Sequence, residues 1–89
     1  MYEIKISDRL RKILKKVFKK DRNRYEIVIK KIDEILGNPY AYKPLSHPLE
    51  GYRRVHIDSH FVLIFKIDEK VKTVVFTDLD HHDNIYKRK

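Results

Sequence analysis

The sequence predicts a single α+β domain over residues 1–89, in which a helical hairpin packs on one face of a small sheet. Its 89 residues are enough for one thin core and too few for two domains. Apolar residues recur at helical spacing over two stretches of the N-terminal half. In the C-terminal half they form short runs typical of strands. The expected order is strand, helix, helix and three strands.

The first expected element is a half-buried strand at "YEIKIS". Tyr2, Ile4 and Ile6 alternate there with Glu3 and Lys5, a period of two. One face of this strand should therefore contact the core.

Two amphipathic helices should follow and form an antiparallel hairpin. In "SDRLRKILKKVFKKD" Ser7 or Asp8 can cap the N-terminus. The second helix starts after "KDRN" and should end at Gly37, with Pro39 just beyond. The predicted apolar faces comprise Leu10, Ile13, Leu14, Val17 and Phe18 in the first helix and Tyr25, Val28, Ile29, Ile32, Ile35 and Leu36 in the second.

Residues 38–50 hold all three prolines and should form an ordered loop. Strands are expected after it at about 52–58, 61–67 and 72–78, with tight turns at "DSH" and "DEK". The run "FVLIFKI" indicates a central strand that is covered on both faces. The tail "HHDNIYKRK" is polar apart from Ile85 and Tyr86.

The positive charge is concentrated near the N-terminus. The chain has 21 Lys and Arg against 13 Asp and Glu, a net charge of +8. Residues 1–31 contain twelve of these basic residues and four of the acidic ones, so the whole surplus lies there. A polyanionic partner is expected, either nucleic acid or an acidic protein segment, although a merely solvated lysine-rich helix has the same composition.

Composition also excludes several classes of protein. The chain has no cysteine, which rules out disulfides and thiolate metal sites. No apolar run reaches the roughly 18 residues of a membrane span, so we expect a soluble, intracellular protein without a membrane partner.

Five histidines in the C-terminal half suggest chemistry on RNA. They are His47, His56, His60, His81 and His82. RNA carries its own nucleophile, the 2′-hydroxyl, so cleavage requires only a base, an acid and cations for the phosphorane. Histidine can supply the first two near neutral pH, and arginine suits the phosphate. The alternative for each histidine is an ordinary surface position.

A metal site and a nucleophilic triad are not expected. His81, His82 and Asp83 are adjacent, but neighbours on an extended chain point in opposite directions and cannot easily share an ion. The serines lie in no elbow-like glycine motif, and the chain has only two glycines.

The C-terminal half resembles a known family. The segment "SHPLEGYRRVHIDSHFVLIFKI", a further strand and "DHHDNIY" are similar to the RelE/ParE superfamily of toxins from type II toxin-antitoxin systems, and within it to the RelE/YafQ-like messenger RNA interferases. The matching pieces are "HPL", "GYR", "H-I-x-x-x-[FW]-x-L-I-[FY]" and "H-x-x-x-[FY]", in this order over residues 46–86. The N-terminal strand and hairpin agree in type and length.

The resemblance implies a fold, an activity and partners. The family fold is a small, twisted, antiparallel-rich sheet like that of microbial ribonucleases. The implied activity is cleavage of messenger RNA on the ribosome in the cytoplasm, with no metal or other cofactor. The implied partner, besides ribosome and messenger, is a cognate, short, acidic, RelB-like antitoxin in a hetero-oligomeric complex.

Position in these motifs also implies site residues. His47 and His56 match family histidines implicated in acid/base catalysis, and His82 and Tyr86 match the histidine and aromatic residue of the closing motif. Arg54 alternates with His56 and is the candidate phosphate contact.

Four further residues are candidate substrate contacts with open roles. Alignment on "GYR" favours Arg53 over Arg54 as the family arginine, so Arg53 stays a candidate contact to messenger or ribosomal RNA. His60 and Phe61 stand where the YafQ-like pattern has Asp-Trp, which leaves open whether a carboxylate assists or His60 replaces it. His81 completes this set.

Other functions remain open from sequence. The chain could be a ParE-like gyrase inhibitor without nuclease activity, a non-catalytic basic RNA-binding module or an inactive toxin. Under the main hypothesis five lysines of the first helix contact ribosomal RNA, namely Lys12, Lys15, Lys16, Lys19 and Lys20.

Overall fold

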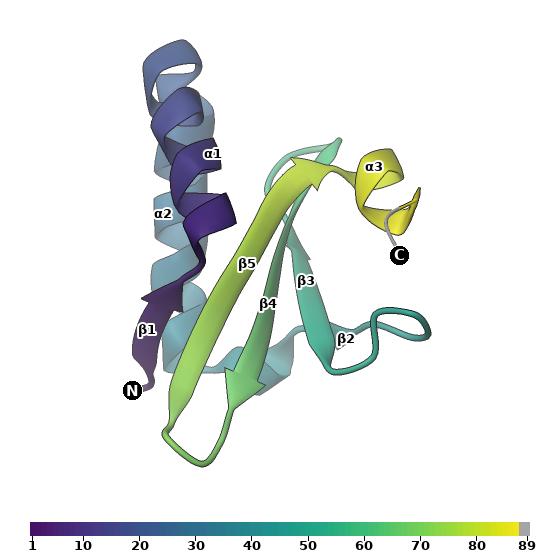
Figure 1. Ribbon diagram of the computed structural model, residues 1–89. Coiled ribbons are helices and arrows are strands. Elements are labelled where there is room, and N and C mark those ends of the chain that lie inside the picture. Colours follow the sequence, from purple (N-terminus) through teal and green to yellow (C-terminus); the bar gives the residue numbers. More distant parts are fainter. Residues whose placement is uncertain (88–89) are drawn as a thin grey trace.

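Five strands form one mixed sheet in the structure, a computed structural model that describes residues 1–87, with the backbone alone for residues 86 and 87 (Figure 1). The spatial order is β1-β5-β4-β3-β2, with β1 parallel to β5 and the other pairs antiparallel. The strands are β1 (Glu3–Ile6), β2 (Lys43–Pro44), β3 (Tyr52–His56), β4 (Phe61–Asp68) and β5 (Thr73–His81). The predicted α+β fold is confirmed.

Helices α1 (Asp8–Lys20) and α2 (Arg22–Gly37) form the predicted antiparallel hairpin. The Ser7 side chain caps α1 by accepting a hydrogen bond from the Leu10 N–H at 3.1 Å. Asp21 ends α1 and caps α2, because its carboxylate accepts from the Arg24 N–H at 3.0 Å. The chain reverses direction at this single linking residue.

The main core lies between this hairpin and the sheet. It joins Leu10 and Leu14 of α1 to Val28, Ile32 and Ile35 of α2, and these pack on alternate residues of the strands. The sheet contributes Leu63, Phe65, Val74, Phe76 and Leu79. We call this side of the sheet the hairpin face.

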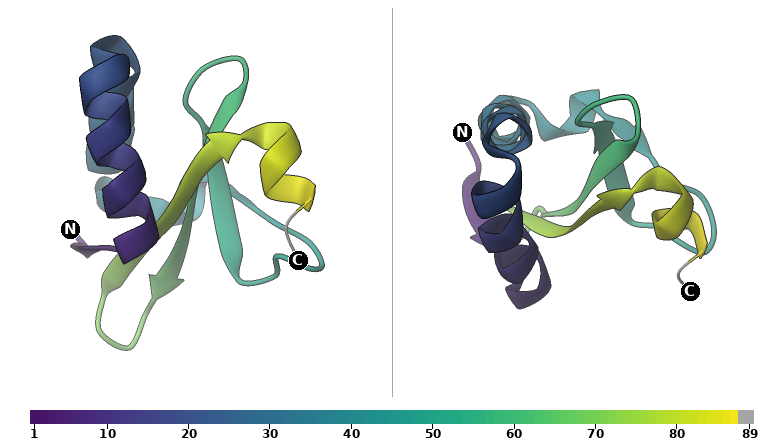
Figure 2. Two further views of the ribbon diagram at one scale, coloured as in Figure 1. Left: turned by 45° about the horizontal axis from the view of Figure 1, so that its top comes forward. Right: turned by 90° about the horizontal axis from the view of Figure 1, so that it is seen from above.

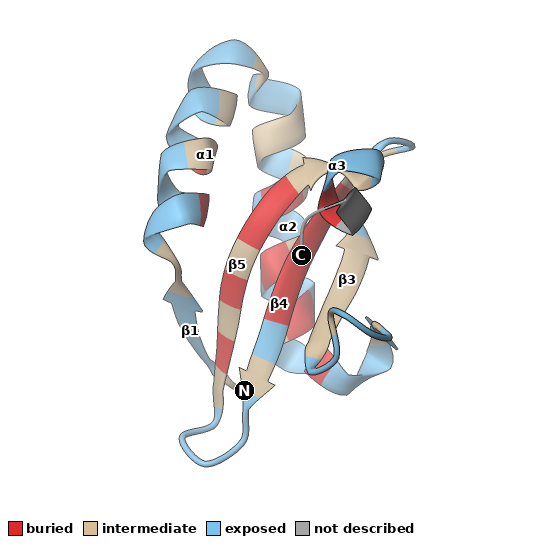
Figure 3. Ribbon diagram, turned by 45° about the vertical axis from the view of Figure 1, so that its right-hand side comes forward, coloured by how far each residue is buried: buried red, intermediate tan, exposed pale blue. Residues whose placement is uncertain are grey.

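A smaller core lies on the opposite side, which we call the α3 face. Val62 and Ile64 project there, and Ile85 of α3 (His82–Lys87) covers them with its side chain 3% exposed. Figure 2 shows the hairpin and α3 on opposite sides of the sheet. Because β4 packs on both sides, the prediction of a doubly covered central strand is confirmed, and Figure 3 shows the N-terminal half of β4 as largely buried.

Several features differ from the sequence prediction. β3 ends at His56, two residues early, and α2 begins at Arg22 and not after Asn23. β5 continues to His81, three residues past the expected end, and the polar tail then forms α3. The proline-rich loop contains a 3-10 turn (Pro39–Ala41) and the two-residue strand β2. In the apolar faces of the hairpin, Phe18 and Ile29 are 42% and 41% exposed instead of buried. Among the described residues, no helix has the length and apolarity needed to cross a bilayer.

Candidate functional site

Arg54 and His56 project from β3 on the α3 face. Val55 and Ile57, which alternate with them, pack into the main core on the hairpin face. The register places Arg54 beside Ile64 and His56 beside Val62 on β4. Val62 and Ile64 therefore form an apolar floor next to a row of one arginine and one histidine.

Arg53 belongs to the other side of the same strand. Its guanidinium donates to the Tyr42 carbonyl oxygen at 2.6 Å and lies 5.1 Å from the Tyr40 ring centroid. Backbone pairing sets it beside Phe65, a main-core residue. The strand alternation thus places Arg54, and not Arg53, with His56.

His47 approaches this face from the loop before β3. Its Nδ1 lies 2.9 Å from a Glu50 carboxylate oxygen, and its side chain is 87% exposed. A hollow of about 180 Å³ between the loop and the strand is lined by both His47 and Arg54. His47 of the loop and Arg54 of β3, two of the predicted site residues, therefore line the same hollow.

His82 begins α3 at the end of β5. Its backbone N–H donates to the His60 carbonyl oxygen at 2.8 Å, which joins α3 to the turn between β3 and β4. His56 is the last residue of β3 before this turn. The fold therefore carries His56 and His82 to the same end of the sheet. Tyr86 belongs to α3 by its backbone, and its side chain lies outside the described part of the structure.

The predicted contacts His60, Phe61 and His81 form an aromatic group at the end of the sheet where β4 begins and β5 ends, and the His81 ring lies 5.7 Å from the His82 ring. The rings of His60 and His81 stack with centroids 5.6 Å apart, and Phe61 meets His81 edge-on at 5.9 Å. The Arg24 guanidinium covers the Phe61 ring at 3.8 Å. Phe61 packs against the main core, so alternation puts it on the hairpin face, away from Arg54 and His56.

Asp58 holds the turn that carries His60. Its carboxylate accepts hydrogen bonds from the backbone N–H groups of His60 and Phe61, both at 2.9 Å, and from Arg24 at 3.0 Å. Partial burial opposes ionisation of Asp58, but these donors outweigh it and hold the pKa of the carboxyl below its usual range. The Asp58 carboxylate thus stabilises the turn between β3 and β4.

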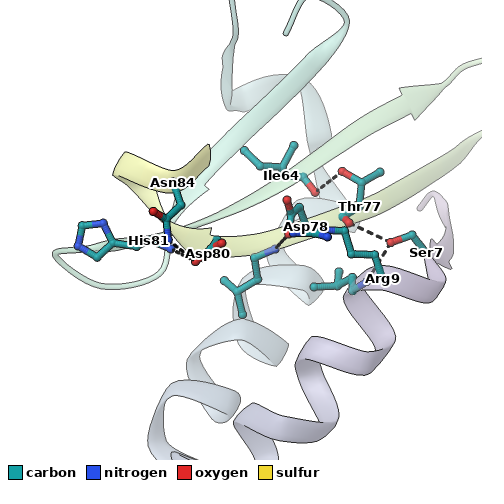
Figure 4. Close-up of polar contacts among 10 residues, drawn as sticks. Ser7, Arg9, Ile64, Thr77, Asp78, Asp80, His81 and Asn84 are labelled. Atoms are coloured by element: carbon teal, nitrogen blue, oxygen red, sulfur yellow. Dashed lines mark hydrogen bonds and ion pairs between the residues drawn. The ribbon is translucent and has the colours of Figure 1, made fainter. Parts of the chain in front are cut away.

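Two carboxylates on the α3 face were missed by the sequence analysis. Asp78 pairs with Ile64 across the sheet and Asp80 with Val62, so both flank the apolar floor on the side away from β3. Arg9 of α1 donates to Asp78 at 3.2 Å, and Asp80 accepts from the His81 N–H at 2.7 Å and from Asn84 at 3.3 Å (Figure 4). The alternation in "TDLD" is the signal that could have found them.

The lysines of α1 belong to the helix layer opposite α3. All five predicted docking lysines are exposed, and Figure 1 shows α1 and α3 on opposite sides of the sheet. A groove of about 560 Å³ adjoins two of them, Lys15 and Lys19. Its lining consists of Ile6, Arg11, Leu14, Lys15, Phe18, Lys19 and Tyr25.

The expectation that adjacent residues cannot share an ion fails at His81, His82 and Asp83. One ligand atom from each lies within 4.8 Å of the others. The chain is not extended here, because β5 ends at His81 and α3 starts at His82. The change from strand to helix brings the three side chains together.

Comparison with known proteins gives the family. Residues 4–86 match the family described as "ParE toxin of type II toxin-antitoxin system, parDE". Over 89 residues the chain is 55% identical to a Methanocaldococcus jannaschii protein named "Putative toxin RelE4", covering 100% of this chain and 95% of the relative.

Two solved structures share the fold. YafQ from E. coli aligns with a TM-score of 0.68 at 25% identity, over 97% of this chain and 99% of YafQ. The toxin-antitoxin complex RelBE2 from Mycobacterium tuberculosis contains a chain that aligns with a TM-score of 0.74 at 23% identity, over 90% of this chain and 96% of that one. With a family match over nearly its whole length, this chain belongs to the ParE toxin family of type II toxin-antitoxin systems, within the RelE/ParE superfamily.

Proposed function

We propose that this toxin is a cytoplasmic, ribosome-dependent endoribonuclease that stops translation by cutting messenger RNA. The observation that supports it most is the placement of Arg54 and His56 side by side on the α3 face, with His47 in the adjoining hollow and His82 at the same end of the sheet. A basic residue and several histidines around a partly apolar floor suit a splayed nucleotide and its phosphate.

The proposed reaction uses the 2′-hydroxyl of the messenger as nucleophile. One histidine, His56 or His82, removes the proton from this hydroxyl while its oxygen attacks the adjacent phosphorus. The other histidine donates a proton to the 5′-oxygen as the bond from phosphorus to that oxygen breaks. Arg54 stabilises the charge on the phosphorane. The products are a 2′,3′-cyclic phosphate and a free 5′-hydroxyl, and no cofactor is needed.

His47 and Tyr86 complete the proposed catalytic set. His47 can orient the phosphate from the loop, because it shares the hollow with Arg54. Tyr86 follows His82 by one turn of α3, and we assign it to stacking on a base or orienting the phosphate. Arg53 and the group of His60, Phe61 and His81 stay outside the proton-transfer step as candidate RNA contacts.

We further propose that α1 serves two partners in turn. The exposed lysines contact ribosomal RNA phosphates when the toxin is active. In the resting complex a short, acidic, RelB-like antitoxin covers the groove along α1, which Ile6 of β1 and Tyr25 of α2 also line, because basic side chains border an apolar lining there. Phe18, at 42% exposed, would then become buried.

Incorporation of labelled precursors after expression of the toxin tests this function. Protein synthesis should stop while DNA synthesis continues. A toxin that carries both His56→Ala and His82→Ala should leave protein synthesis and DNA synthesis running. Arrest of DNA synthesis with broken DNA, unaffected by these substitutions, would instead identify a gyrase inhibitor. Co-expression of the antitoxin should restore growth.

A further inference from the structure

The junction between β5 and α3 places three metal-ligating groups around one point. The His81 Nδ1 lies 3.7 Å from one Asp83 carboxylate oxygen, and the His82 Nδ1 lies 3.4 Å from the other. In a tetrahedral zinc site with bonds of about 2.0–2.1 Å, neighbouring ligand atoms are about 3.4 Å apart. Both histidine-to-carboxylate separations are close to this spacing, and one ligand atom from each of the three residues lies within 4.8 Å of the others.

The geometry at the His81 Nδ1 also suits a metal. The backbone N–H of Asp83 donates to this nitrogen at 3.3 Å, a contact that uses the same lone pair as a bound ion would. That hydrogen bond is long, and a cation beside Asp83 would replace it.

The backbone around the three groups is held in place. Asp80 accepts hydrogen bonds from the His81 N–H and from Asn84, and the His82 N–H is bonded to His60. Ile85 anchors the helix on the second core. The side chains of the three groups remain 37%, 45% and 61% exposed, in chain order from His81 to Asp83, so an ion can reach them.

We propose that His81, His82 and Asp83 bind one first-row divalent cation such as Zn²⁺, and that the bound ion silences the toxin. Two imidazoles and one carboxylate favour Zn²⁺, Ni²⁺ or Cu²⁺ over Mg²⁺, which prefers oxygen ligands. Silencing rests on the proposed function, because the ion would occupy the nitrogen of His82, a residue that we assign to proton transfer.

Calorimetric titration of the untagged toxin with Zn²⁺ tests the site without any ribosome. The expected result is one equivalent of Zn²⁺ per chain and no binding of Mg²⁺. His81→Ala and Asp83→Asn should each weaken Zn²⁺ binding by roughly tenfold or more. Asp33→Asn removes an exposed carboxylate from α2 as a matched control and should leave the affinity unchanged. Circular dichroism of each variant verifies its fold.

Absence of stoichiometric Zn²⁺ binding, or equal affinity in the wild type and both site variants, would overturn the proposed site.

A cleavage assay then tests whether the bound ion silences the toxin. Zn²⁺ should block cleavage by the wild type, a chelator should restore it, and Asp83→Asn should require roughly tenfold more Zn²⁺ for the same block. Equal inhibition of both proteins would overturn the silencing. A wild type that never cuts would instead contradict the proposed function, while the titration still decides the site.

Discussion

His56 and His82 are the residues assigned to proton transfer, and each can be removed without disturbing the main core. Neither His56→Ala nor His82→Ala affects a core side chain, so both variants should fold. Each should lower the single-turnover rate on programmed ribosomes by roughly 100-fold or more, as expected for loss of a general acid or base. Ribosome affinity should stay nearly constant. Unchanged rates in both variants would remove the assignment.

Arg54 and Arg53 offer a matched pair on opposite faces of one strand. Arg54→Ala should slow cleavage by roughly 100-fold, corresponding to about 3 kcal/mol of lost transition-state stabilisation. Arg53→Ala should instead lower the melting temperature, because its guanidinium bonds the Tyr42 carbonyl and covers Tyr40. Single-turnover rates and thermal melts distinguish the two. A larger rate loss for Arg53→Ala would reverse the assignment that strand alternation makes.

Asp58 should stabilise the fold in a pH-dependent way. Its pKa is lowered in the folded chain from the ordinary value of 3.8, so its contribution is fully present above that value and is lost as pH falls through the folded pKa. Asp58→Ala should cost about 1 kcal/mol of unfolding free energy at pH 7, because three donors, two of them partly buried, lose their acceptor. In urea unfolding the difference from wild type should shrink at pH 3. A constant difference would show that ionisation of Asp58 contributes nothing.

At the scale of elements, α3 is fastened to the sheet mainly by Ile85. Ile85→Ala should weaken this docking by about 2 kcal/mol or more, whereas Ile85→Val should cost about 1 kcal/mol. Because His82 begins this helix, cleavage should fall in the same order. Hydrogen exchange of the α3 amides measures the undocking. Full activity with an undocked α3 would mean that His82 needs no fixed position.

The elements of the fold differ in how far sequence alone predicts them. The hairpin and β4 were predictable because long periodic or wholly apolar runs admit few structures. The six-residue helix α3 was not, because its sequence is polar and its main stabilising contact, of Ile85 with Val62 and Ile64, joins residues distant in sequence. The extension of β5 to His81 depends on pairing with Phe61, a contact that is distant in sequence.

In the candidate site, too, features within one strand were predictable, and features that depend on contacts distant in sequence were not. Alternation correctly placed Arg54 beside His56, since both lie within one strand. The proximity of His81, His82 and Asp83 was not predicted, because it depends on the unforeseen turn into α3. Asp78 and Asp80 were overlooked because their relation to β3 appears only once β4 lies between the two strands.

For the whole molecule, the basic helix α1 and the proposed catalytic site lie on opposite sides of the sheet. Replacing Lys15, Lys16 and Lys19 of α1 by Glu should weaken ribosome binding and reduce its dependence on salt, because fewer counterions are released. Replacing three dispersed lysines by Glu gives the same change in net charge and should have a smaller effect. This control comprises Lys30, Lys66 and Lys70. Titrations at two salt concentrations compare the variants, and equal affinities and salt slopes would contradict docking through α1.

The most direct test of the central claim is mapping of messenger 5′-ends in a translating extract. Wild-type toxin should produce new ends with a 5′-hydroxyl, positioned within ribosome-bound codons and absent when ribosomes are removed. The same extract with the toxin carrying His56→Ala and His82→Ala should show none of these ends. Intact messenger in an extract whose translation the wild-type toxin has stopped, or identical cuts by the double variant, would contradict the account.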